Sequence, residues 1–190
     1  MSETTARPSA ARERLLAAAA QVFYTEGINA VGVDRVIEQA KVTRATFYRH
    51  FPGKEDLVRA YIEQADAAIR ARLDEGFAHV PDAGKLLELL VEGIGAEICA
   101  PGFRGCPFIN AAAEFPDPGH PVHRAVVAHR AWFRDALVRL LAAMGYADPQ
   151  AGADALVMLR DGAMVAGYLG RPETARDNFA AAVRALAGRA

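Results

Sequence analysis

The chain has 190 residues, of which 52% are hydrophobic, and its 22 Lys and Arg nearly balance its 23 Asp and Glu to leave a formal net charge of −1. This composition excludes a disordered chain and a polyelectrolyte tail, and the length suits one large domain or a small domain fused to a larger one. No run reaches the roughly 18 apolar residues of a membrane-spanning helix, and two cysteines imply no disulfide framework, so we expect a reducing, cytoplasmic location.

Helix is favoured from the start of the chain, because alanine is the commonest residue and alternating strand patterns are absent. Three helices are predicted in the first 52 residues, at 10–24, 33–40 and 44–51. Gly27 follows the first helix as a stop, Thr43 is a good N-cap for the third, and Pro52 ends the third. Because few residues separate the second helix from the third, these two helices are predicted to form a compact pair.

Longer helical patterns follow Pro52, separated by proline- and glycine-containing breaks. The first of these predicted helices begins near Lys54 and runs past Leu73. Five more are predicted: 86–98, 107–114, a long helix that ends at Met144, about 150–169, and 173–187. Pro107 suits the first position of the 107–114 helix. The sequence therefore predicts an all-α protein of about nine helices.

Residues 33–54, VDRVIEQAKVTRATFYRHFPGK, have the pattern of a helix-turn-helix. The predicted core of this unit consists of Val36, Ile37, Val42 and Phe47. The polar face of the second helix carries Arg44, Thr46, Tyr48, Arg49 and His50. A helix of this kind fits the major groove of DNA, where side chains near its N-terminus reach base edges.

Charge is distributed unevenly along the chain. Residues 34–54 hold five Lys or Arg against two Asp or Glu, a balance of +3, whereas residues 61–190 hold 13 against 16, a balance of −3. A basic end on a mildly acidic body is expected of a protein that meets phosphate with one face. A solvated charged helix in an ordinary bundle would explain the pattern without DNA.

The element TFYRHF followed by Pro-x-Lys resembles the DNA-binding domain of TetR-type transcriptional regulators, and this resemblance extends over about residues 10–60. The stretch GCPFINAAAE at 105–114 is similar to the start of the sixth helix in many members. The resemblance implies a three-helix helix-turn-helix DNA-binding domain at 1–52 and a helical ligand-binding and dimerisation domain at 53–190.

The resemblance also implies DNA contacts at seven positions. The expected DNA-binding residues are Thr43, Arg44, Ala45, Thr46, Tyr48, His50 and Lys54. Arg44 can pair bidentately with guanine, and Ala45 can contact a thymine methyl group. Two residues depart from the family pattern: Lys41 occupies the usual glycine of the turn, and Gly32 replaces a Thr that commonly caps the second helix.

By the same resemblance, the protein is expected to be a homodimeric, ligand-responsive repressor that binds a double-stranded operator and is released by a small molecule. Members pair through their last two helices, which would place two recognition helices about 34 Å apart. The small-residue strip Gly162, Ala163, Ala166 and Gly167 suits close helix pairing, with Leu156, Leu159, Phe179, Val183 and Leu186 around it. Packing within one protomer explains the same pattern.

A small-molecule pocket is expected among the fourth to eighth helices. The candidate ligand-binding residues are Phe103, Phe108, Asn110, Phe115, Trp132, Phe133 and Met158. Apolar side chains with a few polar groups are typical of ligand sites. A bundle core has the same composition, so each of these residues could equally be structural.

Cys106 is a possible redox-reactive residue, because it precedes Pro107 at a predicted helix N-terminus, with Arg104 nearby and Cys99 as a conceivable resolving partner. A structural thiol is the alternative.

The set Glu114, Asp117, His120, His123 and His129 lacks zinc-type spacing, so neither a metal nor a cofactor is predicted. No catalytic motif is present, so an enzyme is not expected. The competing function is a small helical sensor or carrier that binds apolar or electrophilic ligands without DNA.

Overall fold

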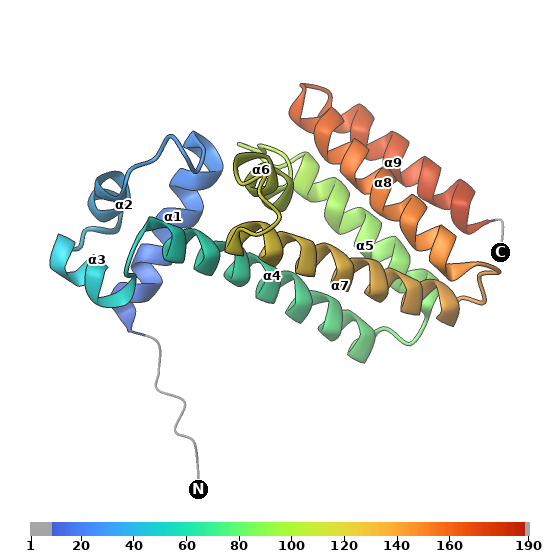
Figure 1. The fold of residues 1–190 in the computed structure, drawn as a ribbon. Helices are drawn as coiled ribbons and strands as arrows, with labels where there is room; N and C mark the ends of the chain where they lie inside the picture. Colours follow the sequence, from blue (N-terminus) through green and yellow to red (C-terminus); the bar gives the residue numbers. More distant parts are fainter. Residues whose placement is uncertain (1–8, 189–190) are drawn as a thin grey trace, which may run out of the picture.

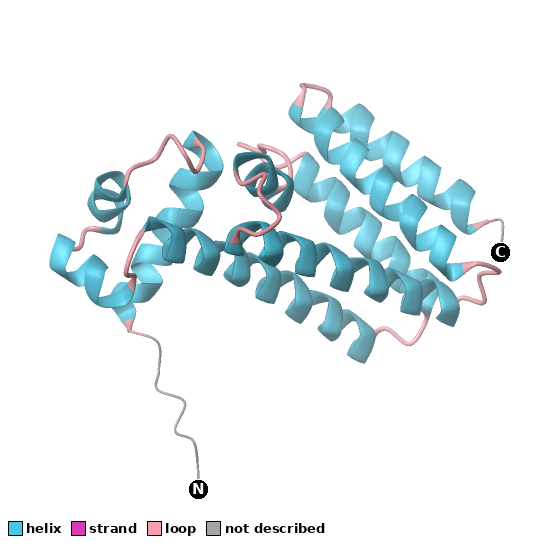
Figure 2. Ribbon diagram, viewed as in Figure 1, coloured by secondary structure: helices cyan, strands magenta, loops and turns pink. Residues whose placement is uncertain are grey.

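A computed structural model describes residues 9–188, in which all regular secondary structure is helical (Figures 1 and 2). The helices are α1 (Ala10–Glu26), α2 (Val33–Ala40), α3 (Arg44–His50), α4 (Lys54–His79), α5 (Ala83–Ile98), α6 (Pro107–Glu114), α7 (Pro121–Ala143), α8 (Pro149–Tyr168) and α9 (Pro172–Ala187). The predicted all-α fold is confirmed. We refer to α1–α3 as the head and to α4–α9 as the body.

The head is a small three-helix unit at one end of the molecule (Figure 1). Gly27 ends α1 with a φ of 93°, a conformation that glycine adopts without steric cost. Phe51, before Pro52, is extended at φ −135° and ψ 117°, which ends α3 as predicted. Phe47 and Val36 are buried at 0% and 1% exposure and hold α3 against the rest of the head.

The long helix α4 connects the head to the body (Figure 1). Its first half packs against α1, and it runs beside α7 for much of its length. In the body, α8 and α9 form a pair at the edge, and α5 packs against α9. A single cluster of buried side chains runs through head and body.

Helix boundaries differ from the prediction mainly at α5. This helix begins at Ala83, three residues earlier than predicted, because the carboxylate of Asp82 accepts a hydrogen bond of 3.0 Å from the backbone N–H of Lys85. Similarly, α1 continues two residues beyond Tyr24, as far as the residue before Gly27. None of the described helices has the length and hydrophobicity to cross a membrane.

The small-residue strip of α8 is divided between two environments. Ala163 and Gly167 face the protomer interior, and a Cβ at Gly167 would lie 2.4 Å from Cγ2 of Ile98. Gly162 and Ala166 are exposed. The predicted partners Leu156, Phe179 and Val183 are buried within the protomer, whereas Leu159 and Leu186 are half-buried. Packing within one protomer therefore explains the larger part of this pattern.

Candidate DNA interface and effector cavity

The start of α3 is fixed by its N-cap. The hydroxyl of Thr43 accepts a hydrogen bond of 3.1 Å from the backbone N–H of Thr46, and the two hydroxyls lie 2.9 Å apart. These contacts leave the N-terminal turn of α3 well defined and open to solvent.

The side chains of Arg44, Ala45, Tyr48 and Arg49 are exposed on α3. Tyr48 is 50% exposed, and its ring meets the buried Phe47 ring edge-on at 5.1 Å between centroids, which restricts the orientation of the phenol. Arg44 forms an ion pair with Asp34. Both partners of this pair are largely exposed, so the pair is weak and Arg44 can exchange Asp34 for a nucleic-acid partner.

Two of the predicted phosphate-binding side chains lie at the border of the head. His50 is half-buried, with Nε2 at 3.3 Å from the hydroxyl of Ser9. Lys54 donates from Nζ to the backbone carbonyl of Asn29 at 3.4 Å. Burial lowers the pKa of Lys54, and the carboxylate of Glu114 opposes that shift. The structure thus gathers Thr43, Arg44, Ala45 and Tyr48 on α3 and sets His50 and Lys54 at its edge.

Lys41 adopts the left-handed conformation that the turn requires, at φ 52° and ψ 50°. Its backbone N–H donates to the carbonyl of Glu38 at 3.1 Å, and the N–H of Val42 donates to Ile37 at 3.3 Å. The turn between α2 and α3 therefore keeps its geometry without glycine, at the steric cost that a side chain has in this region. Gly32 precedes α2 and supplies no side-chain cap.

The side chains of Tyr24 and Glu114 connect the α6 segment to the head. The hydroxyl of Tyr24 donates to the carbonyl of Gly105 at 2.9 Å and accepts from the backbone N–H of Arg104 at 2.8 Å. At the other end of α6, the carboxylate of Glu114 accepts hydrogen bonds from the backbone of the turn after α1. Both ends of the α6 segment are thus attached to the head.

A cavity of about 410 Å³ lies between α4 and α5, and α7 and α8 complete its lining. Its apolar lining consists of Ile69, Leu73, Val80, Leu86, Leu89, Leu90, Ile94 and Phe133, with glycines at 76 and 93. Its polar lining consists of Arg72, Glu75, His79, Glu97, His129 and Arg160. A volume of this size suits a small organic molecule.

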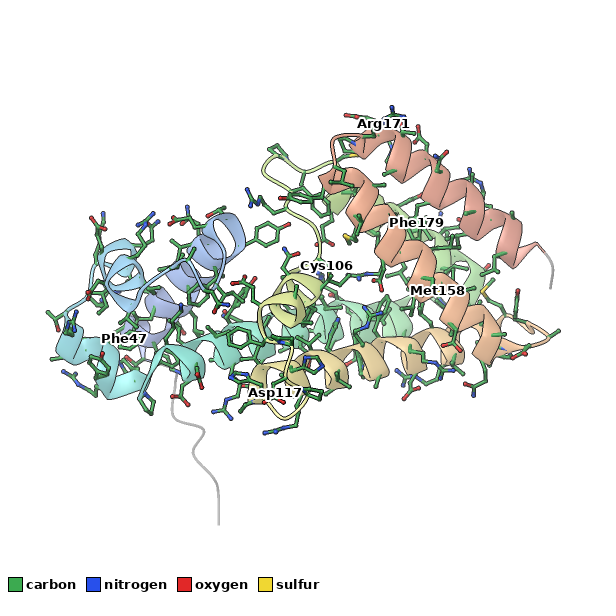
Figure 3. The ribbon with its side chains drawn as sticks, turned by 45° about the horizontal axis from the view of Figure 1, so that its top comes forward. Phe47, Cys106, Asp117, Met158, Arg171 and Phe179 are labelled. Atoms are coloured by element: carbon green, nitrogen blue, oxygen red, sulfur yellow. The ribbon has the colours of Figure 1, made fainter. Side chains whose placement is uncertain are left out.

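Of the predicted ligand-binding residues, Phe133 lines this cavity. Phe108 and Trp132 lie one layer away, where Phe108 stacks on the cavity-lining His129 at 3.6 Å between ring centroids. Met158 is 69% exposed on α8, outside the cavity (Figure 3). The prediction therefore placed Met158 wrongly as a lining residue.

The remaining three predicted residues also lie away from the cavity. Phe103 is half-buried against α8, and the side-chain amide of Asn110 donates to the carbonyl of Arg104 at 2.9 Å. Phe115 borders a second hollow of about 540 Å³ between head and body, which Lys54 also lines. The lining residues missed by sequence reasoning include six leucines and isoleucines of α4 and α5, whose helical spacing is the same for a core and for a cavity lining, and polar side chains such as His129 and Arg160.

Cys106 occupies the N-cap position of α6, makes no side-chain capping hydrogen bond and is 2% exposed (Figure 3). Its sulfur lies 3.5 and 3.6 Å from the two terminal nitrogens of Arg160, so the neighbouring cation is Arg160 and not the predicted Arg104. The guanidinium of Arg104 lies over the ring of Tyr168 instead. Arg160 comes from α8, 54 residues later, and sequence proximity could not reveal it.

His129 is the buried polar residue of the body, with 4% exposure. Its Nδ1 lies 2.7 Å from the carboxylate of Asp66, which also accepts a hydrogen bond from Arg70. Burial lowers the pKa of His129, and the bond to Asp66 only partly offsets this. Within residues 9–188, no three His, Cys, Asp or Glu side chains gather in a way that could hold a metal ion.

Comparisons with known proteins agree with this arrangement. A family model described as bacterial regulatory proteins of the tetR family matches residues 15–61. A solved TetR-family transcriptional regulator from Streptomyces coelicolor is 50% identical to this chain, with a TM-score of 0.90, and the match covers 94% of this chain and 95% of that one.

Two curated relatives match over shorter segments. The HTH-type transcriptional regulator LmrA of Bacillus subtilis is 24% identical over 124 residues, which cover 64% of this chain and 66% of LmrA. The transcriptional regulator AcuR of Cereibacter sphaeroides is 33% identical over 69 residues, or 36% of this chain and 32% of AcuR. The chain thus matches two thirds or less of the length of these two relatives.

Proposed function

This chain belongs to the TetR family of bacterial transcriptional regulators, and on that premise we propose that it is a repressor that a small-molecule effector releases from its operator. The observation that carries the proposal is the co-occurrence of an exposed, basic α3 with a separate cavity in the body. A carrier that binds ligands without DNA would not need the exposed arginines of α3. Such a regulator is expected to act in the cytoplasm.

In this proposal α3 enters the major groove. Arg44, Ala45 and Tyr48 contact bases, and Thr43, Thr46, His50 and Lys54 contact the phosphate backbone together with the Tyr48 hydroxyl. The exposure of the first three and the capped start of α3 support these roles. The proposed domain boundary falls between residues 52 and 53, in the connection between α3 and α4; residues 1–8 and 189–190 lie outside the described range.

The proposed dimer forms through the last two helices, α8 and α9, and the outer face of α8 supplies its exposed apolar surface. Four of the seven large hydrophobic side chains that are exposed in residues 9–188 lie on α8 or directly after it: Met158, Val165, Tyr168 and Leu169. Met158, Gly162, Val165 and Leu169 follow each other at helical spacing, so they share one face. An exposed apolar stripe of this kind favours a self-complementary contact between two copies.

Operator binding tests the proposal most directly. DNA from upstream of the protein's own gene is titrated with the wild type, Arg44→Ala and Tyr48→Ala in a fluorescence anisotropy assay at several salt concentrations. Each substitution is expected to weaken binding by about 5- to 150-fold while the dimer stays folded. Arg171→Ala is the matched control, because Arg171 is exposed at the α8–α9 turn, far from α3 (Figure 3).

Normal operator affinity of both α3 variants would contradict the assigned DNA contacts. Lys54→Ala should instead reduce the slope of log affinity against log salt by about 0.9, as expected for the loss of one phosphate contact.

The redox role of Cys106 stays a prediction. Its contact with the guanidinium of Arg160 supports it, and its 2% exposure favours the alternative of a structural thiol. An effector response that is unchanged in Cys106→Ser would remove the redox role.

A further inference from the structure

We infer that the effector is an amphipathic carboxylate, whose charged head binds Arg160 and whose apolar body fills the cavity between α4 and α5. This inference rests on the proposed effector-responsive function and names the chemical class of the effector.

The inner end of the cavity is marked by its two least exposed polar groups, Arg160 of α8 and His129 of α7. The opposing α4 and α5 contribute six Leu and Ile side chains, two glycines and four polar side chains that are exposed. The inner groups are largely sequestered, since the Arg160 side chain is 12% exposed and His129 is 4% exposed. A ligand with one polar end and a hydrocarbon body matches this distribution.

The charge at the inner end is positive. Arg160 lies 3.1 Å from the carboxylate of Asp161, and that same carboxylate lies 2.7 Å from the guanidinium of Arg130. Two guanidinium groups therefore share one carboxylate, and Arg160 also contacts the Cys106 sulfur. A buried cation with a shared counter-ion favours an anionic ligand and disfavours a cationic one.

The other charged side chains of the cavity lie at its entrance. Arg72, Glu75, His79 and Glu97 are all exposed, so water screens them. Glu75 and Glu97 oppose the single guanidinium of Arg72, so the entrance is slightly acidic, and the charge of Glu97 also acts on Arg160. Because water screens the exposed groups, the sign of the ligand's head is decided by Arg160, whose side chain is only 12% exposed.

Arg160 also connects the cavity to the head. Its guanidinium contacts Cys106 at the start of α6, and α6 ends at Glu114, which binds the backbone of the turn after α1. A carboxylate bound to Arg160 competes with Cys106 and Asp161 for the same N–H donors. Occupation of the cavity therefore alters a contact at one end of α6 while the other end holds the head.

A series of probes that share one alkyl chain tests the inference. Decanoate, decanol and decyltrimethylammonium are each titrated into the full-length protein by calorimetry at pH 7, and then into its operator complex. Decanoate is expected to bind about tenfold or more tightly than decanol, because a hydrogen bond to a charged group is lost with the alcohol. Decyltrimethylammonium is expected to bind most weakly.

Two variants locate the head and the chain of the probe. Arg160→Gln should reduce the advantage of decanoate over decanol to less than about threefold, whereas Arg72→Gln at the entrance should leave it nearly unchanged. Gly93→Phe should block all binding by filling the cavity, and Gly93→Ala, whose Cβ meets nothing within 4 Å, is its control. The Gly93 pair and the wild-type series remain informative if Arg160→Gln unfolds.

Equal affinity for decanol and decanoate, or binding of decanoate that persists in Gly93→Phe, would overturn the inference. So would a failure of decanoate to bind a protein that still binds its operator, which leaves the proposed repressor intact. Tight decanoate binding without operator release would support the inferred ligand class and would contradict the proposal that the effector releases the protein from its operator.

Discussion

The carboxylate of Glu114 accepts a hydrogen bond of 2.9 Å from the backbone N–H of Ile28, although the two residues are 86 positions apart. Its second oxygen accepts from the N–H of Asn29 at 2.5 Å, and the Asn29 amide donates to the carbonyl of Glu114 at 3.3 Å. One side chain at the end of α6 thus satisfies two backbone donors of the head, just after α1 ends. These bonds attach the end of α6 to the head.

Replacement of Glu114 by Ala is expected to destabilise the protein. Two backbone N–H groups lose a charged acceptor, which should lower the free energy of unfolding by about 1–3 kcal/mol. Urea denaturation measures the change. Glu55→Ala is the control, because the Glu55 side chain is 75% exposed and its nearest partner, His120, lies 3.6 Å away. Equal stabilities of the two variants would show that the Glu114 bonds do not hold the head in solution.

Lys41→Gly is expected to stabilise the head. A side chain in the left-handed region costs about 1–2 kcal/mol, and the greater freedom of glycine in the unfolded chain offsets part of the gain. The net increase in unfolding free energy should be about 0.5–1 kcal/mol in urea denaturation. Lys41→Ala removes the same charge but keeps the steric cost, so it should stay near the wild type. A glycine variant no more stable than the alanine variant would contradict the steric explanation.

The head was predictable from the sequence because its signals are local. Thr43 as the cap of α3, Gly27 as the stop of α1 and Pro52 as the end of α3 each act within a few residues of their own position. The exposed positions of Arg44 and Tyr48 followed from the helical period alone.

The cavity was not predictable, because it depends on how distant helices meet. Leu73 and Ile94 have the spacing of core residues, and only the separation of α4 from α5 leaves space beside them. Likewise, Arg160 contacts Cys106 across 54 positions, and no local pattern marks this pair. Aromatic residues were therefore a poor guide: Phe133 lines the cavity, whereas Phe103, Phe108, Phe115 and Trp132 do not.

Gly167→Ala is expected to destabilise the body. The added Cβ would lie 2.4 Å from Cγ2 of Ile98, so α8 and α5 must move apart, at a cost of about 1–3 kcal/mol. The control is Gly93→Ala inside α5, where a Cβ meets nothing within 4 Å. This control should gain up to about 1 kcal/mol from helix propensity. Similar thermal unfolding of the two variants would mean that the close approach at Gly167 is not rigid.

The stability of the body is expected to fall below about pH 6.5 because of His129. Burial holds the pKa of this side chain below its ordinary value, and the hydrogen bond to Asp66 offsets only part of the shift. Below pH 6.5 the unfolded chain therefore binds a proton that the native state excludes, so the free energy of unfolding decreases as the pH falls. The slope from one such group is at most about 1.4 kcal/mol per pH unit.

His129→Gln tests this origin of the pH dependence, because glutamine offers Asp66 an amide N–H but does not titrate. Burial alone would raise the pKa of Asp66, but the hydrogen bonds from Arg70 and His129 outweigh burial and hold that pKa below its ordinary value. The stabilisation from Asp66 is therefore lost only near and below pH 4, which is below the range from pH 5.5 to 7.0 used in this test. Urea denaturation at pH 7.0 and 5.5 should give a smaller stability difference for His129→Gln than for the wild type. Trp132→Phe, which alters the same aromatic cluster and removes no titrating group, should keep the wild-type difference. An undiminished difference in His129→Gln would assign the pH dependence to other groups.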